Sequence, residues 1–151
     1  TTFRLFFPEE IGEATVAPMG DPHLLRGKGE RVLFIDDEQA LCDSTRQILE
    51  KLGYAPVVES SPVAALEAFR ADPAGFDLVI TDLTMPFMSG MELAREMIAL
   101  RPGLPILLAS GFSGNWTAEK VKAEGLRDLL IKPLTASALS LAIRRVFDGS
   151  A

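Results

Sequence analysis

Short apolar runs alternate along the chain with segments whose apolar residues recur at helical spacing. An apolar run bounded by polar residues is typical of a strand buried on both faces. Strands are predicted at 32–35, 55–58, 76–81, 104–109 and 128–131. Helices are predicted at 40–52, from Pro62 through Phe69, at 89–99, at 117–124 and from Thr135 to Phe147. Strict alternation predicts an α/β fold with a parallel sheet covered by helices on both faces.

The first part of the chain lacks this pattern. Residues 8–30 are rich in proline and glycine and show neither a helical nor a strand period, which indicates a flexible linker. We therefore divide the chain into residues 1–29, an N-terminal segment with a linker, and a folded domain at 30–151. Because the chain has no initiator methionine, we expect it to be a piece of a longer protein.

Composition narrows the function classes. A formal net charge of −6 argues against nucleic-acid binding, which requires clustered lysine and arginine. No apolar run is long enough for a membrane span, and no signal peptide opens the chain, so no membrane contact is expected. The single cysteine, Cys42, fits a reducing compartment, and the predicted location is the cytoplasm.

Polar residues stand where the predicted strands end. Asp36 and Asp37 follow the first strand, Asp82 the third, Ser110 the fourth and Lys132 the fifth. The carboxyl ends of parallel strands share one edge of the sheet, where the functional crevice of such folds lies. We therefore expect these five side chains to meet in one site.

This set of residues suits phosphoryl transfer. Three carboxylates in one crevice repel one another, and a hard divalent cation, most commonly Mg²⁺, relieves that repulsion. A carboxylate is also a nucleophile that forms an acyl phosphate by attack on phosphorus. The oxygens of the incoming group would contact Mg²⁺, the Lys132 ammonium and the Ser110 hydroxyl.

Four segments resemble the response-regulator receiver family: VLFIDDE (32–38), DLVITDLTMPFMSGMELA (77–94), ILLASGF (106–112) and LLIKPL (129–134). They occur in order and at the spacing of successive strand–helix units, and the resemblance runs from about Arg31 to the C-terminus. It implies a flavodoxin-like, doubly wound sheet with strand order 2-1-3-4-5.

The resemblance also implies a role for each site residue. The implied roles are phosphoacceptor for Asp82, acidic metal ligands for Asp36 and Asp37, a metal ligand through its backbone carbonyl for Thr84, switch hydroxyl for Ser110 and phosphoryl-contacting lysine for Lys132. The phosphoryl donor would be a phosphohistidine. The Lys132–Pro133 bond is often cis in this family. The chain departs from the family at Leu129, where an aromatic switch residue usually stands.

The N-terminal segment TTFRLFFP (1–8) resembles the last strand of a histidine-kinase ATP-binding domain. A linker followed by a receiver is the order in hybrid sensor histidine kinases, so this resemblance implies the C-terminal receiver of such a kinase. The implied partners are that kinase or a cognate one and a histidine phosphotransfer protein. The oligomeric state stays open.

Two other functions compete with this interpretation. A haloacid-dehalogenase-type Mg²⁺ phosphatase also uses an aspartate nucleophile, but it needs a second aspartate where this chain has Thr84. A degenerate receiver would be only a binding module, and it would have lost the acidic pair, the acceptor or the lysine. A true receiver catalyses its own phosphorylation and slow hydrolysis without turning over an outside metabolite.

Overall fold

A computed structural model describes residues 27–111 and 116–148 of the chain. Its centre is a five-stranded sheet in which every neighbouring pair of strands is parallel. The strands are β1 (Arg31–Ile35), β2 (Ala55–Glu59), β3 (Leu78–Asp82), β4 (Ile106–Ser110) and β5 (Asp128–Ile131). Their order is β2-β1-β3-β4-β5, which confirms the flavodoxin-like topology.

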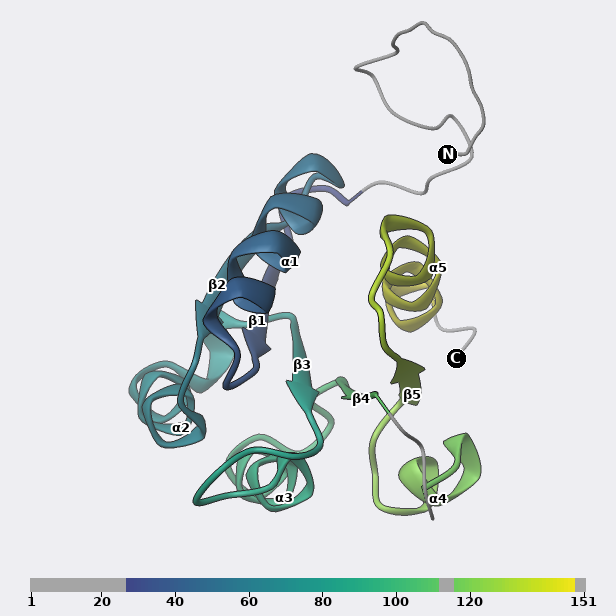
Figure 1. The fold of residues 1–151 in the computed structure, drawn as a ribbon. Helices are drawn as coiled ribbons and strands as arrows, with labels where there is room; N and C mark the ends of the chain where they lie inside the picture. Colours follow the sequence, from purple (N-terminus) through teal and green to yellow (C-terminus); the bar gives the residue numbers. More distant parts are fainter. Residues whose placement is uncertain (1–26, 112–115, 149–151) are drawn as a thin grey trace, which may run out of the picture.

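Helices cover both faces of the sheet (Figure 1). They are α1 (Gln39–Lys51), α2 (Pro62–Ala71), α3 (Gly90–Leu100), α4 (Ala118–Ala123) and α5 (Ala136–Phe147), with a 3-10 turn, η1, at Pro73–Gly75. Helices α1 and α5 lie on one face, and α2, α3 and α4 lie on the other (Figure 1). The Ser61, Ser89, Thr117 and Thr135 side chains cap the starts of α2, α3, α4 and α5 by accepting a backbone N–H.

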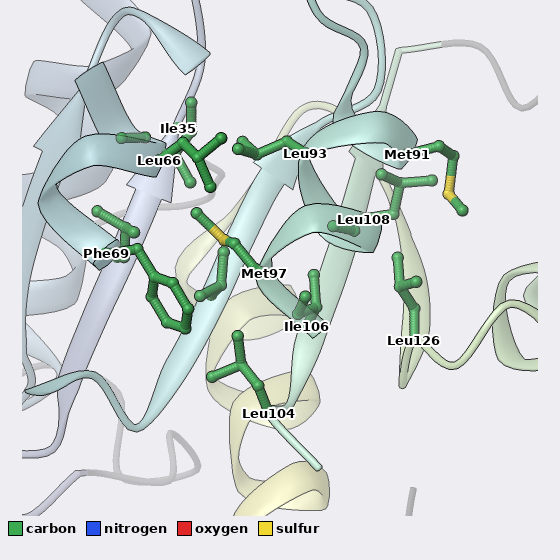
Figure 2. Close-up of a cluster of buried hydrophobic side chains, with 14 of the residues drawn as sticks. Ile35, Leu66, Phe69, Met91, Leu93, Met97, Leu104, Ile106, Leu108 and Leu126 are labelled. Carbon is green, nitrogen blue, oxygen red and sulfur yellow. The ribbon is translucent and has the colours of Figure 1, made fainter. Parts of the chain in front are cut away.

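Alternate residues of each strand supply two separate cores. Leu33 and Ile35 of β1 pack with α2 and α3, whereas Val32 and Phe34 pack with α1 and α5. Figure 2 shows the first core, in which Met97 lies among side chains of α2 and β4 and the side chain of Leu104, which precedes β4. All five residues of β3 are buried, so this central strand holds its carboxyl end in a fixed position.

The third and fourth strands begin two residues later than the sequence predicts. Phe76 and Leu104 are buried, which made them look like strand residues, but neither belongs to the ladder. Phe76 instead stacks on Phe69 with ring centroids 6.3 Å apart. The N–H of Leu104 donates to the carbonyl of Arg101 at 3.2 Å, in a turn. An apolar run therefore marks burial and does not by itself mark strand pairing.

The chain enters the domain along the edge of the sheet opposite the carboxyl ends. Gly27 N–H donates to the Leu52 carbonyl at 2.6 Å and Gly29 N–H donates to the Gly53 carbonyl at 2.8 Å. Glu30 then pairs with Arg144 of α5 at 3.1 Å. Residues 1–26, including the segment at 1–8, lie outside the described residues. Across 27–111 and 116–148, no helix has both the length and the apolar character that a membrane crossing needs.

Candidate functional site

Three aspartates converge at the carboxyl edge of the sheet. Asp82 is the last residue of β3, and Asp36 and Asp37 directly follow β1. The two strands are neighbours, with Ile35 level with Thr81, so Asp36 and Asp82 leave the sheet side by side. One carboxylate oxygen from each of the three aspartates lies within 4.8 Å of the others. The sequence prediction that these side chains share one site therefore agrees with the geometry.

Lys132 joins the cluster from the end of β5. Its Nζ lies 2.5 Å from Oδ2 of Asp36 and 2.8 Å from Oδ1 of Asp82. The other carboxylate oxygen of Asp36 accepts the backbone N–H of Glu38 at 2.9 Å. One ammonium thus bridges two carboxylates that come from separate strands, and the Lys132–Pro133 peptide that follows is cis.

The carboxylates differ in their exposure to solvent. Asp36 is 1% exposed and Asp82 is 6% exposed, whereas Asp37 is exposed. Burial raises the pKa of Asp82; the hydrogen bond from Lys132 opposes that shift, and the nearby charges of Asp36 and Asp37 add to it. Burial alone would lower the pKa of Lys132, but its hydrogen bonds to Asp36 and Asp82 raise it. The site therefore carries more negative charge than its one lysine neutralises.

That excess suits a divalent cation. Three carboxylates and one ammonium leave a formal charge of −2, which a single Mg²⁺ balances. Carboxylate oxygens are the hard ligands that Mg²⁺ prefers, and the exposed position of Asp37 leaves one side of the cluster open to water. The donor set therefore fits the predicted metal.

The remaining predicted residues lie at the same edge. Ser110 is the last residue of β4 and is buried, and its carbonyl accepts the Lys132 N–H at 2.9 Å. Thr84 is exposed in the loop after β3. The contacts predicted for the Ser110 hydroxyl and for the Thr84 carbonyl stay predictions. Leu129, at the usual aromatic position, is partly buried and packs on the core beneath α3 and α4.

Two residues that support the site were not assigned to it from the sequence. Cys42 is fully buried, and its thiol donates to the backbone carbonyl of Asp36 at 3.1 Å. Gly90, the first residue of α3, is buried against the backbone of Asp82 and Leu83. The signal for Gly90 was present, since a glycine directly after a helix-capping serine in a tight loop indicates close backbone approach. Cys42 had no such signal.

Comparison with known proteins gives a consistent result. The response regulator receiver domain family matches residues 32–144. The chain is 36% identical over 114 residues to the C4-dicarboxylate transport transcriptional regulatory protein DctD of Rhizobium meliloti, covering 76% of this chain and 24% of that protein. It is 34% identical over 119 residues to the aerobic respiration control sensor protein ArcB of Escherichia coli, covering 78% of this chain and 15% of ArcB. The chain thus spans only a minor part of the curated relatives it matches.

Solved structures agree with the sequence comparison. A response regulator receiver domain protein from Clostridium thermocellum shares 32% identity and a TM-score of 0.73, with 80% of this chain and 95% of that chain covered. The response regulator TrrA of Thermotoga maritima, solved with Mg²⁺ and BeF, has the same fold with a TM-score of 0.69 at 24% identity, covering 78% of this chain and 98% of that one. With its strand order and its acidic cluster, the chain belongs to the response regulator receiver domain family of two-component systems.

Proposed function

We propose that this receiver accepts a phosphoryl group from a phosphohistidine onto Asp82, with Mg²⁺ held by Asp36, Asp37 and Asp82 and by the backbone carbonyl of Thr84. The observation that carries the proposal is the Lys132 ammonium, which lies 2.5 Å from Asp36 and 2.8 Å from Asp82 within a cluster of three carboxylates. A lysine so placed suits an oxygen-rich group that arrives on Asp82.

The proposed reaction is a nucleophilic displacement at phosphorus. A carboxylate oxygen of Asp82 forms the new P–O bond while the P–N bond to the donor imidazole breaks. The imidazole nitrogen leaves with the bonding electron pair and takes up a proton from solvent. The Lys132 ammonium moves from the Asp82 carboxylate to the phosphoryl oxygens, and the Ser110 hydroxyl donates to another of these oxygens.

The chain's own residues also set the protonation state of the nucleophile. Lys132 holds a positive charge beside Asp82 and so favours the ionised form that the attack needs, against the effect of burial. A bound Mg²⁺ would supply further neutralisation of charge on the phosphoryl oxygens. Asp36, which is buried and held by Lys132 and the Glu38 N–H, provides a fixed metal ligand.

Labelling with a small phosphodonor tests this function. Incubation with Mg²⁺ and phosphoramidate is expected to add one phosphoryl group that is labile to base, as an acyl phosphate is. The Asp82→Asn variant should take up none, and Asp77→Asn, at the opposite edge of the sheet, should label like the parent chain. Normal labelling of Asp82→Asn would refute the acceptor assignment, and rapid release of phosphate over many turnovers would favour a phosphatase.

For the whole protein we propose a hybrid sensor histidine kinase that works in the cytoplasm. Its receiver would accept the phosphoryl group from its own or a cognate kinase, and a histidine phosphotransfer protein is a further partner. The match to the sensor protein ArcB supports this context, as does the segment at 1–8. The match to DctD, a transcriptional regulatory protein, supports the receiver but not the kinase. The coding sequence upstream of residue 1 tests the proposal: an ATP-binding kinase domain should precede Thr1, and a different domain there would refute it.

A further inference from the structure

Phe87 has an unusual conformation for a bulky residue. It lies in the loop between β3 and α3 with φ at 71°. The N–H of Met88 donates to the carbonyl of Pro86 at 2.8 Å, so Phe87 is the central residue of a γ-turn with positive φ. This form of the γ-turn is rare and strained, and positive φ in a residue with a large side chain is a genuine outlier. Glycine would adopt the same turn without that strain.

The side chain of Phe87 gains nothing from the rest of the domain. Phe87 is 96% exposed. The other large apolar residues that are exposed in the described part of the chain range from 43% at Leu100 to 52% at Ile131. The chain therefore keeps a phenylalanine in a strained turn where the ring contributes no packing to the fold. A strained residue that the fold itself does not need is a sign of function.

The position of Phe87 in the fold indicates that its function concerns Asp82. The loop that carries Phe87 begins after Asp82 and ends at Gly90. A hydrogen bond closes it beside Asp82, because the N–H of Gly90 donates to the carbonyl of Leu83 at 2.8 Å. Asp82 is only 6% exposed, so a donor reaches it only from the carboxyl edge of the sheet. A protein donor that brings a phosphohistidine to Asp82 must therefore approach at this edge, where the loop that carries Phe87 begins and ends.

We infer that Phe87 is the apolar anchor by which the receiver binds the protein that carries the phosphohistidine. This inference rests on the proposed function of Asp82. Large aromatic side chains that become buried in an interface contribute a disproportionate share of binding energy. The donor would present an apolar pocket beside its phosphohistidine. Basic or polar groups around that pocket would face the exposed Asp37 and Glu38.

Two donors separate docking from chemistry. Phosphoramidate needs no docking surface, whereas phosphotransfer from a purified, autophosphorylated histidine kinase does. For this experiment we choose, from a panel of purified, autophosphorylated histidine kinases, the kinase that labels the parent chain fastest. For Phe87→Gly we expect kcat/KM with the kinase to fall by about tenfold or more. Labelling by phosphoramidate should change by less than about twofold.

Further variants exclude a structural explanation. Phe87→Gly should melt at the same temperature as the parent chain or higher, because glycine relieves the positive φ. Phe87→Tyr keeps the ring and should retain the kinase reaction within about threefold. Leu100→Ser removes an exposed apolar side chain at the other end of α3 and should leave both reactions unchanged.

The other outcomes would overturn the inference. An equal loss with both donors would mean that Phe87 acts on the chemistry at Asp82. An unchanged kinase reaction, or no transfer from any kinase while phosphoramidate still labels Asp82, would mean that Phe87 anchors no donor. A concentration-dependent dimer that Phe87→Gly abolishes, with phosphotransfer unchanged, would assign the residue to a contact between two copies of the chain. Failure of phosphoramidate to label Asp82 would instead refute the proposed function.

Discussion

A Cβ atom on Gly90 would lie 2.1 Å from the backbone carbonyl oxygen of Asp82. The first turn of α3 is therefore packed directly on the last peptide of β3. The same turn is fixed by a capping box, in which Ser89 and Glu92 each accept the other's backbone N–H. The position of the Asp82 carboxylate thus depends on a helix start that has no room for a side chain.

Gly90→Ala is predicted to destabilise the domain. Because the added methyl group would meet backbone atoms, which do not rotate away, either the helix start or the end of β3 must shift. We expect the free energy of unfolding to fall by about 1–3 kcal/mol. Denaturation in urea, followed by circular dichroism, measures this change.

A second glycine provides the control for that experiment. Gly111 directly follows β4, and a Cβ added to it would meet no atom of residues 27–111 and 116–148 within 4 Å; its φ is not positive. Gly111→Ala should therefore change the free energy of unfolding by less than about 0.5 kcal/mol. Equal effects of the two substitutions would show that the close approach of Gly90 to Asp82 does not limit stability.

Lys132→Ala is predicted to make stability more dependent on Mg²⁺. Without the ammonium, the buried Asp36 and Asp82 lose a shared partner, and the repulsion among three carboxylates is opposed only by a cation. Because Lys132 is partly exposed, we expect a loss of about 1–3 kcal/mol in the absence of Mg²⁺, the cost of leaving a buried acceptor without its donor. Saturating Mg²⁺ should restore more stability to this variant than to the parent chain.

Labelling separates that effect from the role of Lys132 in phosphoryl transfer. With Mg²⁺ present, the rate of phosphorylation of Lys132→Ala by phosphoramidate should fall by about a hundredfold, since a charged donor to the phosphoryl oxygens is lost. Lys122→Ala, which removes an exposed lysine from α4, should change neither quantity. A Lys132 variant that labels at the parent rate would contradict the proposed contact with phosphate.

The parallel sheet and the acidic cluster could be predicted from the alternation of strands and helices along the sequence, whereas the strand order came from the resemblance to the receiver family. A parallel sheet brings the residues after each strand to one edge, so Asp36, Asp82 and Lys132 could be grouped before any distance was known. The starts of β3 and β4 could not be placed, because Phe76, after η1, and Leu104, in a turn, are buried like strand residues although neither pairs with a neighbouring strand.

The roles of Phe87 and Cys42, which depend on backbone conformation, could not be predicted from residue type or spacing. The positive φ of Phe87 breaks the usual preference for glycine at such a turn, so residue type pointed away from the observed structure. The thiol of Cys42 donates to the carbonyl of Asp36 across the start of α1, a contact that no spacing rule predicts. Periodicity specifies which face a side chain occupies, but it does not specify how a loop turns.

Asp37→Ala is predicted to weaken Mg²⁺ binding while leaving the fold intact. Asp37 is exposed, so its removal costs little packing, but it takes one of the three carboxylates from the proposed metal site. Titration calorimetry should show a Kd for Mg²⁺ raised by about tenfold or more, because even the loss of a group that only supports a metal ligand weakens metal binding by about 10–100-fold. The Mg²⁺-dependent rise in melting temperature should shrink in parallel.

The neighbouring acid is the matched control for Asp37. Glu38 is also exposed but is not among the carboxylates that converge, so Glu38→Ala should bind Mg²⁺ nearly as well as the parent chain. Equal weakening by both substitutions would indicate a diffuse effect of negative charge. That result would remove the support for Asp37 as a metal ligand.

The contact between Glu30 and Arg144 is predicted to make stability depend on pH. Burial alone would raise the pKa of Glu30, but hydrogen bonds from backbone N–H groups and from the Arg144 guanidinium lower it below its ordinary value of 4.5. A carboxyl whose pKa is lower in the folded state stabilises the fold above its unfolded pKa and loses that contribution as the pH falls through the folded pKa.

Glu30→Gln should therefore reduce the free energy of unfolding by about 1 kcal/mol near neutral pH. The difference from the parent chain should shrink as the pH falls below 4.5. Glu67→Gln, at an exposed position on α2, should leave the free energy of unfolding nearly unchanged near neutral pH. Denaturation in urea at a series of pH values measures both variants, and a difference for Glu30→Gln that stays constant down to low pH would show that its charge does not anchor the start of β1 to α5.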